Sequence, residues 1–163
     1  MLQYDAGGNF WTAVESKPFF GNEPAKIDDK GRLKIPNAHR AVFHDREFGN
    51  EVYVTSLTGE SVLVYPMPVW QEIMRKLSLA PAAHPARRKY IERVSYYGQR
   101  AEIDSQGRML IHPRLRQTAL MDSPVDVLGN VDHLEVWNHE RLLPRVATPL
   151  TDDELTAVAG FGI

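Results

Sequence analysis

The chain has 163 residues, a length that suits one ordinary domain or two small ones. With 43% apolar and 25% charged residues it can form a folded core, which argues against a disordered protein. The absence of cysteine excludes a disulfide scaffold, cysteine-ligated metal and a thiol nucleophile, and fits a reducing compartment. Because no apolar run could span a membrane and the first nine residues lack signal-peptide features, we expect a cytoplasmic protein without a membrane partner.

Charge is segregated along the chain. The formal net charge of −2 excludes a uniformly basic protein surface, so any binding of a polyanion depends on where the positive charges lie. Basic residues concentrate in segments 24–44, 75–93 and 100–116, whereas acidic residues concentrate in 122–140 and 152–154. This pattern is compatible with a polyanion-binding surface, although solvated charged helices would produce the same one.

In chain order, residues 1–18 show no clean periodicity, and residues 1–21 are interpreted as an N-terminal extension. An internal repeat follows: residues 27–35 (IDDKGRLKI) match residues 103–111 (IDSQGRMLI) at a constant offset of 76, with Ile, Asp, Gly, Arg and Ile identical in place. Arg40 and Arg116 share that offset. Later strand-like segments match at slightly smaller offsets, which indicates a duplication whose second copy has shorter loops.

Each repeat motif predicts a short strand ending at the aspartate, a tight Asp-x-x-Gly turn, and a second strand beginning at the arginine. A glycine in such a turn supplies a positive φ without a Cβ penalty, and the aspartate can accept hydrogen bonds from the turn amides. The predicted turn-structuring residues are Asp28, Gly31, Asp104 and Gly107.

After each motif we expect a short helix that follows a proline, two alternating strands and a closing helix. The predicted helices and strands are 37–43, 51–56, 61–65 and 68–77 in the first copy, and 114–120, 124–128, 133–137 and 139–146 in the second. Eight of the strand residues are predicted to be core: Val52, Val54, Val62, Val64, Val125, Val127, Leu134 and Val136.

Between the copies, the Ala- and Pro-rich segment 78–85 is predicted to be a linker that leads into a basic helix, residues 86–97. We expect Tyr90, Ile91 and Val94 to dock this helix between the copies, and its cations to contact either DNA or the acidic patch of a neighbouring subunit. The last dozen residues predict a short acidic helix or a disordered end.

About 45 residues are too few for either copy to bury a core alone, so the copies must pack on each other. The sequence therefore predicts an α+β fold of two tandem hairpin-based β modules with short helices, packed as a pseudo-twofold unit. The expected divisions are 1–21 (extension), 22–69 (first module), 70–97 (helix, linker and basic helix), 98–141 (second module) and 142–163 (C-terminal helix and acidic tail).

The doubled Ile-Asp-x-x-Gly-Arg motif, with Leu-x-Ile-Pro after its first occurrence and the run from Leu63 to Trp70, resembles the MraZ family of bacterial regulators, which carry two SpoVT/AbrB-like swapped-hairpin modules. The resemblance spans roughly residues 19–146. It implies a DNA-binding transcriptional regulator, nucleoid-associated in the cytoplasm, that represses its own cluster of division and cell-wall genes. Its implied partners are double-stranded DNA with promoter direct repeats and further copies of the chain in a ring. Phe20 stands where the family usually has a basic residue.

The candidate DNA-binding residues lie in and after the two turns, which we expect to share one side of the molecule: Lys30, Arg32, Lys34, Gln106 and Arg108. An arginine can grip phosphate oxygens bidentately, a lysine offers a point charge, and a glutamine can donate to phosphate or to a base edge. For the two arginines an ion pair with Asp28 or Asp104 is the compatible alternative, and for the other three it is simple solvation. Arg40 and Arg116 are expected to form structural ion pairs.

Enzyme chemistry is not expected. The six histidines have no metal-ligand spacing, and the carboxylates Asp28 and Asp29 lie in a turn that is poorly placed for desolvation. No phosphate-binding glycine loop or nucleophile elbow is present, so we expect no catalytic residue, metal, cofactor or small-molecule substrate. The alternative function, favoured by the net acidity, is an oligomeric scaffold or antitoxin-like partner protein without relevant DNA affinity.

Overall fold

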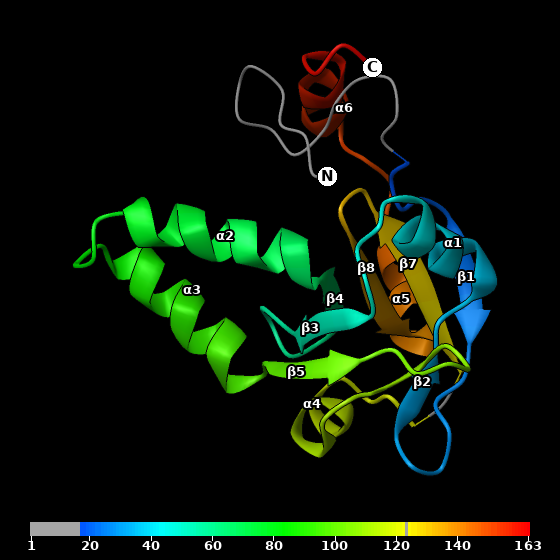
Figure 1. Cartoon of the computed structure of the whole chain (residues 1–163). Helices are drawn as coiled ribbons and strands as arrows, with labels where there is room; N and C mark the ends of the chain where they lie inside the picture. Colours follow the sequence, from blue (N-terminus) through cyan, green and yellow to red (C-terminus); the bar gives the residue numbers. More distant parts are fainter. Residues whose placement is uncertain (1–16, 123) are drawn as a thin grey trace.

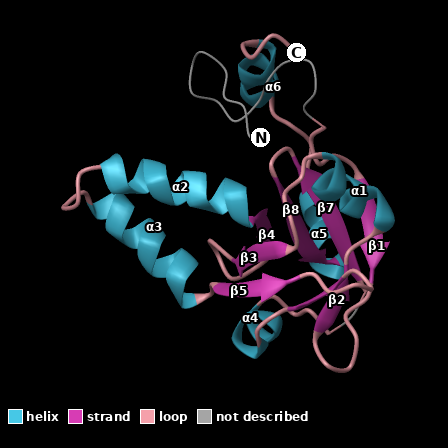
Figure 2. Cartoon of the chain, viewed as in Figure 1, coloured by secondary structure: helices cyan, strands magenta, loops and turns pink. Residues whose placement is uncertain are grey.

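The computed structural model describes residues 17–122 and 124–163, which form an α+β fold (Figures 1 and 2). The elements of the first half are β1 (Asn22–Ala25), β2 (Arg32–Lys34), α1 (Asn37–Asp45), β3 (Glu51–Thr55), β4 (Val62–Pro66) and α2 (Met67–Leu79). Those of the second half are α3 (Pro85–Tyr96), β5 (Gln99–Glu102), β6 (Arg108–Leu110), α4 (Pro113–Thr118), β7 (Val125–Asn130), β8 (His133–Asn138), α5 (His139–Ala147) and α6 (Asp152–Ala159). Within these ranges, no helix combines the length and the apolar character that crossing a bilayer requires. The predicted α+β class is confirmed.

The strands form two antiparallel sheets that join the two halves of the chain. The larger sheet has the order β1-β7-β8-β4-β3-β5, and β2 and β6 form a separate two-stranded ribbon. Strands β1 to β4 correspond to β5 to β8, and the order of the larger sheet is unchanged when each strand is exchanged for its counterpart. Four of the six strand pairings link one half of the chain to the other, so the core is shared between them.

The strands on either side of each turn do not form the simple hairpin that the sequence pattern favours. β1 pairs with β7 and β2 pairs with β6, so both partners come from the other half of the chain. Within the first turn region, an isolated Ile27–Leu33 bridge and an Asp28–Arg32 backbone bond connect the two flanks, instead of a continuous ladder. β2 and β6 have only three residues each, so neither could be stable without a partner strand.

The core lies on the inner face of the larger sheet. All eight residues predicted as core are at most 2% exposed, which confirms that part of the prediction. Phe19 also belongs to the core: it is 1% exposed, bridges Val131, and its ring packs against Phe43 and Phe48. Of the predicted N-terminal extension, residues 1–16 lie outside the described residues.

Helices α2 and α3 form a helical hairpin that projects from the sheet (Figure 1). α2 continues to Leu79, so the linker between the two helices is shorter than predicted. The first part of α3 lies along α2 instead of docking between the copies, because its partly buried Tyr90 packs beside α2. The end of α3 contacts both halves: the Val94 carbonyl accepts hydrogen bonds from β3, and the Tyr96 carbonyl accepts one from Arg114 of α4.

The C-terminal segment forms the helix that was one of the two predicted outcomes. Thr151 caps α6 in a capping box with Glu154, in which each side chain accepts a hydrogen bond from the other residue's backbone N–H. Three acidic residues in its first turn interact favourably with the helix dipole and so stabilise the helix. This short helix is therefore encoded locally.

Candidate nucleic-acid interface

The first turn is organised by one carboxylate. Asp28 Oδ1 accepts hydrogen bonds from the backbone N–H groups of Lys30 (3.0 Å) and Arg32 (2.9 Å). Asp28 Oδ2 accepts from Arg32 Nε at 2.8 Å, and Gly31 closes the turn at a φ of +80° by donating to the Asp28 carbonyl. The aspartate thus fixes both the turn and the direction of the arginine.

The second turn repeats this arrangement bond for bond. Asp104 Oδ1 accepts from the N–H groups of Gln106 and Arg108, both at 2.9 Å, and Oδ2 accepts from Arg108 Nε at 3.0 Å. Gly107 has a φ of +79°. The roles predicted for the four turn residues agree with this geometry, and the ion pair considered for each arginine is present.

The hydrogen bonds lower the pKa of both aspartates below the usual 3.8 of the side chain. The largest cause is the backbone N–H of the arginine four residues on, followed among the lowering effects by that arginine's guanidinium. Both carboxylates therefore stay ionised at neutral pH and keep holding the arginines. Each carboxylate bonds the guanidinium through Nε alone, so the Nη groups of Arg32 and Arg108 are not engaged by it.

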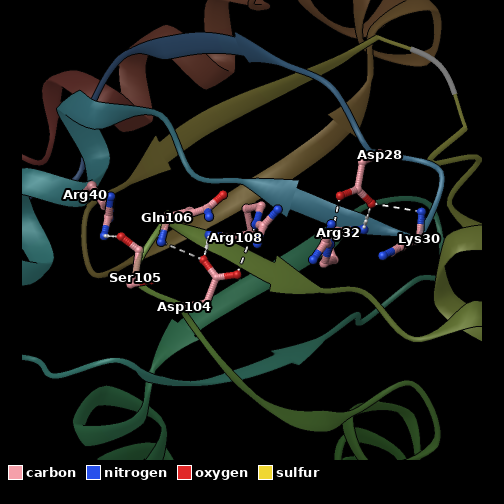
Figure 3. A network of polar contacts seen from close by, with 8 residues as sticks. All are labelled: Asp28, Lys30, Arg32, Arg40, Asp104, Ser105, Gln106 and Arg108. Atoms are coloured by element: carbon pink, nitrogen blue, oxygen red, sulfur yellow. Dashed lines mark hydrogen bonds and ion pairs between the residues drawn. The ribbon is translucent and has the colours of Figure 1, made fainter.

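The ribbon places both arginines on one face. Leu33 and Met109 face each other across β2 and β6 and are at most 1% exposed. Because side chains alternate along a strand, the neighbouring residues point to the opposite, solvent side of the ribbon. That outer row contains Arg32, Lys34, Arg108 and Leu110. The arginine side chains are 28% and 29% exposed, and Figure 3 shows them between the two aspartates.

The two turns lie at opposite ends of this short ribbon. Ile35 N donates to the Gly107 carbonyl at 2.8 Å, and Ile111 N donates to the Gly31 carbonyl at 3.0 Å. Four residues therefore separate the turns along the ribbon, or about 13 Å. The exposed tip residues Lys30 and Gln106 mark the two ends, with the arginines between them. All five candidate residues are thus brought to one ribbon.

Arg40 and Arg116 lie against the turns, which differs from the ion pairs predicted for them. Arg40 of α1 donates from Nη2 to the Ser105 carbonyl in the second turn at 3.3 Å (Figure 3). A Cβ on Gly107 would approach Arg40 Nη1 to 2.9 Å, and a Cβ on Gly31 would overlap the guanidinium of Arg116. Each turn is therefore packed by an arginine from the other half of the chain. The signal in the sequence was their shared offset of 76 with the motifs.

The buried histidine His39 belongs to the core and not to this surface. His39 is buried, with Nε2 3.0 Å from the Val127 carbonyl and its ring edge-on to Phe19, so it serves the core. Among residues 17–122 and 124–163, no group of three or more histidine, aspartate and glutamate side chains is placed to hold a metal ion.

Comparison with known proteins gives a consistent result. A family model described as "MraZ protein, putative antitoxin-like" matches residues 19–92 and 98–142. A protein of Acidobacterium capsulatum named transcriptional regulator MraZ is 38% identical over 146 residues, which cover 89% of this chain and 99% of that protein. Proteins of the same name are 37% identical in Koribacter versatilis, with the same coverage, and 33% identical in Chromobacterium violaceum over 83% of this chain and 91% of that protein.

The fold and these relatives define the class: a transcriptional regulator built from two similar halves that exchange strands. More specifically, the chain belongs to the MraZ family, as the doubled motif indicated.

Proposed function

We propose that this regulator binds double-stranded DNA through the outer face of the β2–β6 ribbon. The observation that carries the proposal is the row of Arg32, Lys34 and Arg108 on one exposed face, with both arginines held in place by aspartates. A two-stranded ribbon fits the major groove of B-DNA, which is about 12 Å wide. The turn residues Lys30 and Gln106 would then reach phosphates or base edges at either end of the ribbon.

One chain would bind weakly, because Asp28 and Asp104 neutralise part of the positive charge on this face. With only about four phosphate contacts per chain, useful affinity requires several copies that act on several sites at once. We therefore propose a homo-oligomer, in the form of a ring, that binds repeated promoter boxes and represses its own division and cell-wall gene cluster. Residues 22–69 and 98–141 would be the two modules of each copy, in a cytoplasmic, nucleoid-associated protein without catalytic activity.

The test is a fluorescence anisotropy titration of promoter DNA with one, two or three boxes over a range of salt concentrations. We expect affinity to rise steeply with box number. The Arg32→Ala/Arg108→Ala variant should lower the slope of log K against log salt by about 2 per engaged chain. The matched control is Lys17→Ala/Arg100→Ala, which also removes two cations from exposed ion pairs, those with Asp45 and Glu51, and should bind nearly as wild type does.

The second candidate function is an oligomeric, antitoxin-like partner protein without relevant DNA affinity. The description of the matching family model favours it, as does the net charge of −2. An oligomeric wild-type protein that binds neither heparin nor promoter DNA at low salt would support this candidate and refute the proposed DNA interface. Equal affinity for one box and three boxes would refute only the role of oligomerisation.

A further inference from the structure

The end of the chain exposes an unusual amount of apolar surface. Thirteen large apolar side chains are exposed among the described residues, and six of them lie after residue 142, where the family match ends. They are Leu143, Val146, Leu150, Leu155, Phe161 and Ile163. Clustered exposed apolar residues of this kind mark interaction surfaces.

Helix α6 combines this apolar character with negative charge. Leu155, Val158 and Ala159 have the spacing of a single helix face, and Leu155 is 50% exposed. Asp152, Asp153 and Glu154 form the first turn of the helix, and no lysine or arginine follows Arg145. The capping box and the acidic first turn stabilise the start of the helix, which presents this face in the structure.

The α2–α3 hairpin has the complementary character. A groove of about 260 Å³ on it is lined by Ile73, Lys76, Leu77 and Tyr90, and Leu79 nearby is 74% exposed. The hairpin carries six cations against two glutamates, Glu72 and Glu92. These cations are Arg75, Lys76, Arg87, Arg88, Lys89 and Arg93. It therefore offers an apolar groove with basic surroundings.

We propose that α6 of one copy docks on the α2–α3 hairpin of a second copy, with Leu155 and Val158 in the groove and the acidic first turn beside the basic residues of α3. The proposal rests on the self-assembly part of the proposed function. In this structure α6 does not occupy the groove of its own chain, because α6 lies apart from the α2–α3 hairpin (Figure 1). Helix α5, which contacts β7 and β8, holds the start of the tail there, and the four residues 148–151 reach at most about 14 Å.

Because the chain has no cysteine, engineered cysteines give a direct test. Lys76→Cys lines the groove, and Ala159→Cys lies on the apolar face of α6 without removing Leu155. When the two single variants are mixed and oxidised, we expect a disulfide between chains at a yield at least about tenfold above that of Thr58→Cys mixed with Ala159→Cys, since a disulfide requires Cα atoms within about 7 Å. Thr58 lies in the exposed β3–β4 loop and serves as the control.

Charge reversal gives a second readout in the wild-type background. Arg88→Glu/Lys89→Glu should weaken assembly in analytical ultracentrifugation, as should Asp152→Lys/Asp153→Lys, and combining the two pairs should restore it. A chain that ends at Thr148 should also assemble more weakly, and its DNA binding to a single box should stay unchanged.

The remaining outcomes separate the two proposals. A wild-type protein that is monomeric at all concentrations would refute self-assembly. An oligomer that gives no disulfide between chains and keeps its mass after truncation would refute only this interface. A disulfide formed within one chain of a Lys76→Cys/Ala159→Cys double variant, with none between chains, would assign the groove to the same copy. Loss of DNA binding in Arg88→Glu/Lys89→Glu, with assembly unchanged, would assign the basic helix to DNA.

Discussion

The guanidinium of Arg116 occupies the space that a side chain at Gly31 would fill. Gly31 belongs to the first turn and Arg116 to α4 of the other half of the chain, and Arg40 has the reciprocal relationship with Gly107. Each turn therefore needs its glycine for two independent reasons: a positive φ and room for an arginine. The two halves of the proposed DNA surface thus depend on each other.

This relationship makes Gly31→Ala more harmful than backbone strain alone would make it. A residue with a Cβ at this φ costs about 1 kcal/mol, and displacing the flexible end of Arg116 from the turn should bring the loss in unfolding free energy to about 1.5 kcal/mol. The control is Gly49→Ala, because Gly49 has a similar φ of +75° but nothing within 4 Å of an added Cβ. Urea denaturation measures both, and equal losses would contradict the packing role of Arg116.

The aspartates of the turns predict a pH dependence of stability. Because the folded-state pKa of Asp28 and of Asp104 lies below the usual 3.8, each contributes stability that is fully present above that value and is lost as the pH falls through the folded pKa. We expect the wild type to lose stability below about pH 4 more steeply than Asp28→Asn/Asp104→Asn, whose amides do not titrate. The measurement is urea unfolding at a series of pH values from 6 to about 2.5. Parallel profiles would show that the two carboxylates are not stabilised in the fold.

The repeat motif allowed much of this site to be predicted from sequence. An aspartate, a glycine and an arginine at fixed spacing define a turn through local hydrogen bonds, so Asp28, Gly31 and Arg32 could be assigned without knowledge of the rest of the fold. The eight core residues followed from strand alternation in the same way.

What could not be predicted are the contacts between the halves. Residues 22–25 have the same local pattern whether they pair with β2 or with β7, and only the packed structure decides. The projection of α2 and α3 away from the sheet was missed for a related reason: the apolar face of α3, with Tyr90 and Val94, fits either a neighbouring helix or a sheet. The contact of Arg116 with Gly31 is likewise non-local. The sequence around an arginine does not show whether its guanidinium packs against a distant turn or forms an ion pair.

The link between Asp28 and Arg32 predicts that lysine cannot replace this arginine. Arg32→Lys keeps the positive charge but loses the planar group that bonds Asp28 through Nε and leaves its Nη groups unengaged by that carboxylate. Affinity for multi-box promoter DNA should fall about tenfold with nearly the wild-type salt slope, whereas Arg32→Ala should reduce both. Anisotropy at several salt concentrations distinguishes these cases. Full activity of the lysine variant would show that charge alone matters at this position.

The end of α3 predicts a non-additive effect at the base of the projecting hairpin. Gly98 N donates to the Ser95 carbonyl, so the Val94 carbonyl at the helix end instead accepts hydrogen bonds from Tyr53 Oη (3.0 Å) and Thr55 Oγ1 (2.7 Å) of β3. Either Tyr53→Phe or Thr55→Val should cost about 1 kcal/mol of unfolding free energy, because one bond to the carbonyl remains.

The double variant should cost about 3 kcal/mol, more than the sum of the two, because it leaves a buried carbonyl without these partners. Thr148→Val is the matched control: its hydroxyl also donates to a helix carbonyl, that of Pro144 at 2.9 Å, but in an exposed position, so its cost should stay near zero. Urea denaturation of the four variants and the wild type completes the cycle. Additive losses would mean that water replaces both donors at the Val94 carbonyl and that the hairpin is held to the sheet by apolar packing alone.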